Sequence, residues 1–248
     1  MRVTVITVCF NNEKTIADTI SSVWQQEYED IEHIIIDGGS TDKTLFIAGT
    51  VPKRNGIILS EKDQGIYDAM NKGINQATGD LIAFLNADDF YFDKFTIAKV
   101  VDRIKSSHAD ALYGDLVYVH PNKTEKVFRY WKAGSYQAGK FKKGWMPPHP
   151  TFFAKKALFR QFGGFNLALK SAADYELMLR FIHKNKCSVV YLPEVLVKMR
   201  TGGKSNASIK NRIRANKEDL EAWYINGLKP IALFRLLKPL SKIHQLWS

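Results

Sequence analysis

Hydrophobic and polar positions in the first 90 residues fall into two alternating patterns. Short apolar runs predict buried strands at 3–8, 32–37, 57–60 and 80–85. Between these runs, apolar side chains recur at helical spacing over 14–26 and 66–77, and a short helix is expected after the turn at 38–42. Strand–helix–strand units joined by short links predict a parallel sheet with right-handed crossovers and helices on both faces.

The rest of the chain is less regular. We predict strands at 110–119, 126–131, 151–154 and 188–192, and helices at 155–162, 173–184 and 208–226. The segment between 132 and 149 contains three glycines and two prolines, which predicts a long loop. Loops of this length inside a compact domain are often functional.

Composition narrows the class of protein. A chain of 248 residues with 45% hydrophobic and 25% charged residues has ordinary globular composition. Its apolar stretches fall short of the roughly 18–20 residues of a spanning helix, and its start does not resemble a signal peptide. Two cysteines exclude a disulfide framework. We therefore expect a soluble or peripheral cytoplasmic protein.

The net charge of +11 points to an acidic partner, and it is unevenly spread. The stretch 201–248 carries 9 Lys and Arg against 3 Asp and Glu. No helix-turn-helix or other nucleic-acid motif accompanies this charge, so a nucleic-acid partner is not expected. From Pro230 to Trp247, leucines fall on one side of a helix and Lys or Arg on the other. This pattern indicates attachment to an anionic membrane surface, or else packing on the protein itself or on a second copy in a homodimer.

Carboxylates and amides follow the predicted strands. Asn11 follows the first, Asp37 ends the second, Asp63 follows the third, and Asp88 with Asp89 follows the fourth. In an open parallel sheet, ligands bind outside the carboxyl ends of the strands. Although Asp and Asn are common in turns, two adjacent carboxylates repel each other and need a cation or donors nearby. Oxygen ligands without His or Cys suit Mg²⁺ or Mn²⁺, so these residues predict a metal-bound diphosphate and a nucleotide.

Four segments around these residues resemble family 2 glycosyltransferases: 4–12 (TVITVCFNN), 36–42 (IDGGSTD), 61–73 (EKDQGIYDAMNKG) and 84–89 (FLNADD). The resemblance covers about residues 3–205, and the four motifs in this order are highly specific together. It implies an α/β fold of GT-A type, a Rossmann-like, mostly parallel sheet flanked by helices. We expect a nucleotide-sugar half at about 1–90, an acceptor half at about 91–205, and a basic helical C-terminal extension at 206–248.

The resemblance also implies roles for single residues. A nucleotide-sugar donor, usually UDP-linked, would contact Thr7, Asn11, Asp37, Asp63 and Asp88. Asp89 would be the ligand of Mn²⁺ or Mg²⁺.

On the acceptor side, the segment 171–180 (SAADYELMLR) resembles the one that supplies the general base, with Asp174 at the base position. Many relatives have a second acid where this chain has Ala173. The alternative for Asp174 is a capping role at the start of the following helix.

Four further residues are candidates for contacts with the acceptor or the diphosphate. Arg200 and Lys204, in 200–205 (RTGGKS), resemble a loop that closes on the diphosphate; the alternative is a solvated basic loop. His149 lies in a proline-framed segment beside Trp145, which could stack on a sugar ring. A lone His is more often structural or on the surface.

The resemblance implies a metal-dependent inverting transfer of one sugar from a nucleotide-diphosphate sugar to a hydroxyl of a glycan or polyprenyl-linked acceptor. Such a reaction belongs to surface polysaccharide synthesis at the inner face of the plasma membrane. Two alternatives remain. A nucleotidyltransferase usually carries a glycine-rich loop after the first strand, and 9–14 contains no glycine. A non-catalytic sugar-nucleotide-binding protein would not need both Asp89 and Asp174.

Overall fold

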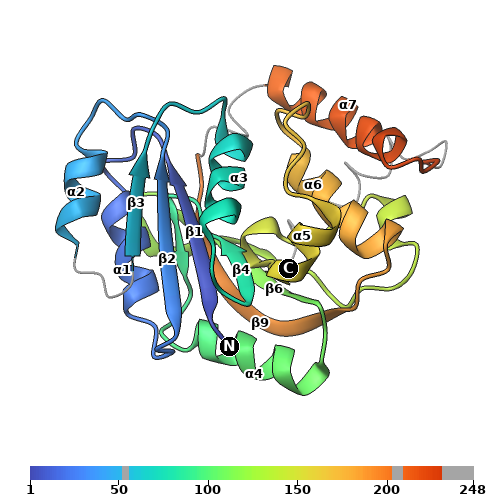
Figure 1. Ribbon diagram of the computed structural model, residues 1–248, viewed down its shortest axis with the longest axis horizontal. Coiled ribbons are helices and arrows are strands. Elements are labelled where there is room, and N and C mark those ends of the chain that lie inside the picture. Colours follow the sequence, from blue (N-terminus) through green and yellow to red (C-terminus); the bar gives the residue numbers. More distant parts are fainter. Residues whose placement is uncertain (52–55, 203–208, 231–248) are drawn as a thin grey trace.

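A computed structural model describes residues 1–51, 56–202 and 209–230, apart from the side chains of 209–212 (Figure 1). The first part of the chain forms β1 Val3–Cys9, α1 Ile16–Trp24, β2 Ile31–Asp37, α2 Thr44–Thr50, β3 Gly56–Ser60, α3 Ile66–Gln76 and β4 Leu81–Phe84. The second part forms β5 Asp89–Tyr91, α4 Thr96–Ser107, β6 Ala111–His120, β7 Lys123–Trp131, β8 Phe153–Lys155, α5 Lys156–Phe162, α6 Ala173–Met178, β9 Val189–Arg200 and α7 Ile209–Ile225. A π-helical turn, Leu179–Lys184, continues α6.

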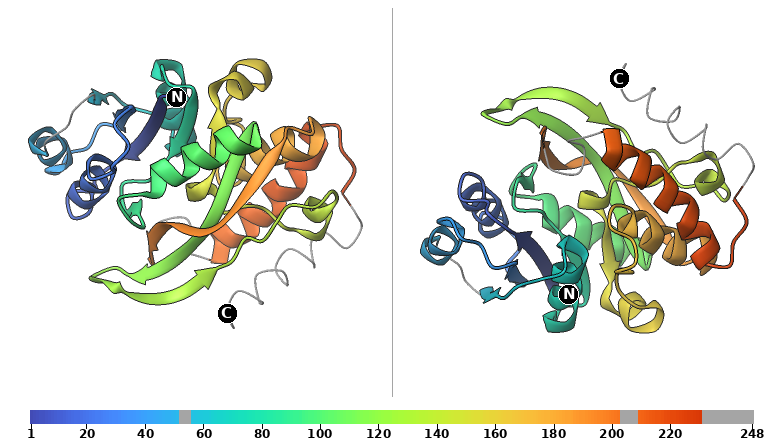
Figure 2. Two further views of the ribbon diagram at one scale, coloured as in Figure 1. Left: turned by 90° about the horizontal axis from the view of Figure 1, so that it is seen from below. Right: turned by 90° about the horizontal axis from the view of Figure 1, so that it is seen from above.

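Among the described residues, nine strands form one sheet in the order β3-β2-β1-β4-β8-β6-β9-β5, with β7 paired to β6. β3, β2, β1 and β4 are parallel, as the strand–helix–strand pattern predicts. β8 is antiparallel to both β4 and β6, so the sheet becomes mixed beyond β4. Figure 2 shows the β6–β7 hairpin projecting from one side of the molecule. The predicted α/β fold is confirmed, with its parallel part in the first half of the chain.

Helices cover both faces of the sheet. Successive side chains of a strand point to opposite faces, and every residue of β1 is buried. Ile6 packs in a cluster with side chains of α3, α5, α6 and α7. Val3 and Val5 pack in a second cluster with α4 and with Val23 of α1. This two-sided burial explains why the first strands read as continuous apolar runs.

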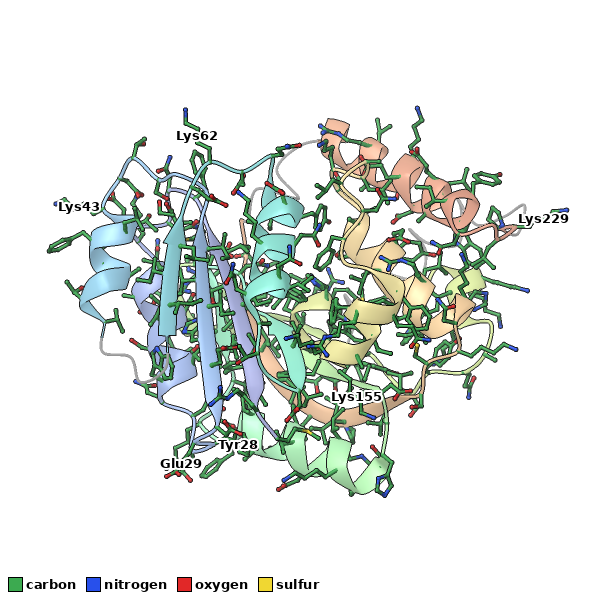
Figure 3. All side chains as sticks on the ribbon, viewed as in Figure 1. Tyr28, Glu29, Lys43, Lys62, Lys155 and Lys229 are labelled. Carbon is green, nitrogen blue, oxygen red and sulfur yellow. The ribbon has the colours of Figure 1, made fainter. Side chains whose placement is uncertain are left out.

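The parallel strands end at one edge of the sheet. Cys9, Asp37 and Ser60 are neighbours in register across β1, β2 and β3. In Figure 3, Lys62, which follows β3, lies at this edge, whereas Glu29, which precedes β2, lies at the opposite end. The loops at the carboxyl edge are therefore the expected location of a ligand site.

Four elements differ from the predictions. β5 and α4 were not predicted, and β9 extends to Arg200 instead of ending near 192. α7 is not separate from the rest of the fold, because its Trp223 is fully buried in the cluster that contains α6.

The predicted amphipathic segment from Pro230 to Trp247 lies, apart from Pro230, outside the described residues. The membrane and dimer predictions for it stay predictions. Within the described part of the chain, no helix has the length and apolar character needed to cross a membrane.

Candidate functional site

A cavity of about 1230 Å³ lies at the carboxyl edge of the parallel strands. It is larger than the roughly 300–1,000 Å³ of most small-molecule sites. Its wall comes from the loops after β1, β3 and β4, from the β6–β7 hairpin, from β9 and from α7. Residues from these segments include Asn11, Asp63, Asp88, Phe128, Arg200 and Asp219.

Asp37 shapes the loop after β2. Its Oδ2 accepts hydrogen bonds from the Gly39 and Ser40 amides at 3.1 and 3.0 Å and from the Ser60 hydroxyl at 2.7 Å. Burial opposes ionisation of this carboxyl, but these hydrogen bonds hold its pKa below the usual value. The side chain is fully buried. Asp37 therefore organises the loop, and its predicted contact with a nucleotide stays a prediction.

Of the two candidates in or after β1, only Asn11 lines the cavity. Asn11 adopts a left-handed φ of 55°, which Asn tolerates better than most residues. Its Oδ1 accepts the Thr41 amide at 2.9 Å, which ties the loop after β1 to the loop after β2. Thr7 is fully buried within β1, with its hydroxyl 2.9 Å from Nε2 of His33. A direct contact between Thr7 and a nucleotide is therefore not supported.

Asp63 lines the cavity and depends on a glycine. Its Oδ1 accepts the Gly65 amide at 2.8 Å. A Cβ atom at position 38 would lie only 2.3 Å from Oδ2 of Asp63. Gly38 therefore leaves the space in which the Asp63 carboxylate rests.

The acidic turn after β4 presents one carboxylate to the cavity and buries the other. Asp88 is partly exposed and lines the cavity. Asp89 is fully buried as the first residue of β5. Its pKa is raised well above the usual range by burial and by the charge of Asp88, while Asn86 and Arg200 oppose the rise. The sequence assigned the metal to Asp89, which stays a prediction; in the structure Asp88, and not Asp89, is among the described residues that line the cavity.

Two side-chain oxygens of the acidic turn have no hydrogen-bond partner among the described residues. They are Oδ1 of Asn86 and Oδ1 of Asp89, and both are buried. Buried oxygen atoms normally have partners, so two unpaired acceptors at the base of an acidic turn indicate a place for positive charge. The described residues include no group of three or more His, Cys, Asp or Glu side chains suited to a metal. Mg²⁺ and Mn²⁺ commonly bind through one or two carboxylates, waters and a phosphate, so the turn fits such an ion.

Arg200 holds the acidic turn from β9. Its guanidinium donates to the Asp88 carbonyl at 2.8 Å and forms an ion pair with Asp18 of α1. It lies over the Phe90 ring at 4.8 Å and is only 6% exposed. These contacts engage Arg200 with the acidic turn and with α1, and its predicted contact with the diphosphate stays a prediction. Lys204 lies outside the described residues.

Asp174 lies in the first turn of α6. The N-cap of this helix is Ala172, so the capping alternative for Asp174 is wrong. The hydroxyl of Tyr67 donates to Oδ1 of Asp174 at 3.1 Å. Tyr67 belongs to α3, and Ile66 and Ala69 of the same helix line the cavity. Asp174 is partly exposed but is not among the described residues that line this cavity.

His149 and Trp145 pack against other aromatic rings. His149 is 9% exposed and lies 5.8 Å, between ring centroids, from both Phe84 and Phe165. Burial lowers its pKa, and the charge of Asp174 opposes this shift. The Trp145 indole donates to the Ala133 carbonyl at 2.9 Å and stacks on Tyr136 at 5.4 Å. These contacts anchor the 132–149 loop, so a sugar-stacking role for Trp145 is not supported.

Two residues near Asp174 were missed from the sequence. Tyr67 lies within the recognised 61–73 segment, so that motif could have signalled it. Glu218 of α7 accepts the amides of Ser171 and Ala172 at 2.6 and 3.0 Å. No local pattern predicts this contact, because Ser171 and Ala172 precede Glu218 by 47 and 46 positions in the sequence.

Solved structures share this arrangement of strands and helices. TarS of S. aureus, residues 1–349 in complex with UDP-GlcNAc, has a TM-score of 0.72 at 21% identity. The likeness covers 91% of this chain and 65% of the TarS chain. The mannosyltransferase PcManGT from Pyrobaculum calidifontis, in complex with GDP-Man and Mn²⁺, has a TM-score of 0.68 at 21% identity. This second likeness covers 98% of this chain and 70% of the PcManGT chain. The fold is therefore that of GT-A glycosyltransferases.

Sequence comparison extends the likeness from fold to family. A PGL/p-HBAD biosynthesis glycosyltransferase of Mycobacterium bovis is 33% identical over 195 residues, covering 77% of this chain and 73% of that protein. Residues 4–163 match the family described as Glycosyl transferase family 2, and this segment contains the four motifs of the donor half. The chain belongs to glycosyltransferase family 2.

Proposed function

We propose that the chain transfers one sugar from a nucleoside-diphosphate sugar, UDP-linked, to a hydroxyl of a glycan or lipid-linked acceptor, with inversion at the anomeric carbon. The observation that carries this proposal is the meeting of Asp63 and Asp88 in one cavity beside α3, the helix whose Tyr67 holds Asp174. The complexes of TarS with UDP-GlcNAc and of PcManGT with GDP-Man support a nucleotide-sugar donor.

The nucleotide is proposed to bind between the loops after β1 and β3. Asn11 and Asp63 both line this part of the cavity. Their side-chain oxygens are suited to accept hydrogen bonds from ribose hydroxyls or a base N–H. Asp37 contributes indirectly, because it fixes the loop that carries Gly38, on which Asp63 rests.

The diphosphate is proposed to lie over the acidic turn. Asp88, which lines the cavity, would hold Mn²⁺ or Mg²⁺. The PcManGT complex with Mn²⁺ supports a divalent ion. When bound, such an ion neutralises negative charge on the departing diphosphate. Arg200 keeps Asp88 in place by donating a hydrogen bond to the backbone carbonyl of Asp88.

The proposed reaction is a single displacement. The acceptor oxygen attacks the anomeric carbon and forms the new C–O bond while the bond to the diphosphate oxygen breaks. Asp174 takes the proton of the acceptor hydroxyl as general base. The Tyr67 hydroxyl orients this carboxylate by donating to Oδ1. Attack from the face opposite the leaving group inverts the anomeric centre.

Apolar side chains at the cavity support an acceptor with an apolar part. Phe10, Ile66 and Phe128 line the cavity, yet they are 47%, 44% and 75% exposed. Exposed apolar groups beside a polar site are typical of surfaces that bind an apolar partner. A polyprenyl-linked acceptor would satisfy these side chains while presenting its hydroxyl to Asp174.

The test of the proposed function is a panel of sugar nucleotides with Mn²⁺ and no added acceptor. We expect slow hydrolysis of one UDP-sugar, with UDP and the free sugar of inverted anomeric configuration as products. Formation of UTP and a sugar 1-phosphate when pyrophosphate is added to the same sugar nucleotide would support a nucleotidyltransferase instead. Binding without turnover, both alone and with lipid-linked acceptors, would support a non-catalytic protein.

Gly38→Ala tests the place of Asp63 in nucleotide binding. The new Cβ would force the Asp63 carboxylate to move, so we expect the Kd for UDP with Mn²⁺ to rise roughly tenfold or more, as for the loss of one charged hydrogen bond. Gly49→Ala in α2 is the matched control, because a Cβ there meets nothing within 4 Å. Calorimetric titration measures both constants. An equal Kd for UDP in both variants would show that Asp63 does not contact the nucleotide.

A further inference from the structure

The first turn of α6 is capped from another part of the chain. Its N-cap residue is Ala172, whose methyl group cannot accept a hydrogen bond. The Glu218 carboxylate of α7 takes this role: its Oε2 accepts the amides of Ser171 at 2.6 Å and Ala172 at 3.0 Å. A negative charge at a helix N-terminus also interacts favourably with the helix dipole. Asp174 lies two residues beyond Ala172, so Glu218 fixes the backbone that carries it.

Glu218 is one of several contacts from a single face of α7. Trp223 donates from Nε1 to the Tyr175 hydroxyl at 2.9 Å, and Asn226 donates from Nδ2 to Oε1 of Glu176 at 2.9 Å. Glu218 and Trp223 of α7 and Asn226, which directly follows the helix, are 7%, 0% and 4% exposed. Figure 1 shows α7 lying along α6, and Figure 2 shows the same neighbourhood from above. The contact between the two helices is therefore a buried, hydrogen-bonded interface.

Asp174 is consequently held from two sides. Tyr67 of α3 contacts its carboxylate, and Glu218 of α7 contacts the backbone that precedes it. α3 and α7 also line the donor cavity, through Ile66 and Asp219 among others. The same two helices thus form part of the cavity wall and support the candidate base.

We propose that Glu218 is a positioning residue for Asp174, so that the C-terminal helix α7 is part of the catalytic machinery. This inference rests on the proposed function, in which Asp174 is the general base. A displacement of about 1 Å in a catalytic group can cost roughly a hundredfold in rate. Loss of the Glu218 cap frees two backbone amides next to the turn that aims Asp174.

The experiment compares three variants of the full chain on the UDP-sugar that the wild type hydrolyses fastest. Glu218→Ala is expected to lower kcat roughly ten- to hundredfold with the donor KM unchanged. Glu218→Gln retains an amide oxygen that can accept both N–H groups, so it should recover most of the lost rate. Glu221→Ala is the matched control, because Glu221 is exposed on the same helix. Should Glu218→Ala not fold, Glu218→Asp keeps the charge but shortens the reach, and it should lower kcat with KM unchanged.

A double-mutant comparison separates positioning from simple stabilisation. If Glu218 acts through Asp174, Glu218→Ala should lower turnover no further in an Asp174→Asn background. Hydrogen exchange at the Ser171 and Ala172 amides should be faster in Glu218→Ala than in Glu221→Ala. An equal loss of turnover in both backgrounds would overturn the positioning role and leave Asp174 as the base. Undiminished turnover in Asp174→Asn would overturn both the positioning role of Glu218 and the role of Asp174 as base. Hydrolysis of the sugar-nucleotide panel would then show whether the chain is a transferase at all.

Discussion

Asp174→Asn is expected to lower turnover by roughly two to four orders of magnitude, the usual range for loss of a general base. Asn is nearly isosteric with Asp, so the contact with Tyr67 and the fold of α6 should persist, but the amide cannot take a proton. Nucleotide affinity should barely change, because Asp174 is not among the described residues that line the donor cavity. Steady-state hydrolysis of the UDP-sugar and calorimetric titration with UDP measure the two quantities.

The matched control for this prediction is Asp102→Asn, which changes an exposed carboxylate on α4. It should leave both turnover and affinity as in the wild type. A large rise in the UDP Kd with turnover preserved in Asp174→Asn would mean that Asp174 binds the donor and does not act as a base.

The donor half was predictable because its signals are local. β1, β2 and β4 are buried on both faces, so they appear in the sequence as short apolar runs, and the edge strand β3 has a similar run although it is mostly exposed. The polar residues that follow these runs necessarily gather at one sheet edge. Asn11, Asp63 and Asp88 therefore meet in the cavity as expected. β5, in contrast, has only three residues and is formed by pairing with β9, which lies more than 100 positions away in the chain.

Which side a residue faces was harder to predict than where it lies along the chain. Asp88 and Asp89 are adjacent, and only the start of β5 determines that Asp89 turns inward. Arg200 looked like a free cation, but Asp18, 182 positions away, pairs with it. Trp145 resembled a sugar-stacking residue until Tyr136 and Phe141 supplied its ring partners. For Asp89 and Arg200 the deciding contact is distant in sequence, so no local pattern reports it, whereas the ring partners of Trp145 lie in its own loop.

The acceptor half depends most on such distant contacts. The predicted boundary at 205 follows the extent of the family resemblance and the basic charge of the stretch after it. In the structure the buried Trp223 and the contact of Glu218 join α7 to the elements before that boundary. The net charge of a segment therefore does not predict whether one side of its helix packs against the rest of the protein.

Asp88→Asn is expected to have the other large effect, because Asp88 is the carboxylate that faces the cavity at the acidic turn. Removing its charge should lower turnover by at least about a hundredfold, comparable to the loss of one strong electrostatic contact in an active site. UDP affinity should also lose its dependence on Mn²⁺. The measurement is a set of UDP titrations with Mn²⁺ and with EDTA, alongside turnover under the same conditions.

Asp89→Asn provides the internal comparison for this assignment. Asp89 is fully buried, so its variant should keep the Mn²⁺ dependence of UDP affinity and lose less turnover than Asp88→Asn. We thus expect opposite effects of the two adjacent substitutions on the Mn²⁺ dependence of UDP affinity. If Asp89→Asn abolishes the Mn²⁺ dependence while Asp88→Asn preserves it, the assignment from burial is wrong and the metal ligand is Asp89. Full wild-type turnover in excess EDTA would reject a metal at either carboxylate, because the acidic turn would then act without a cation.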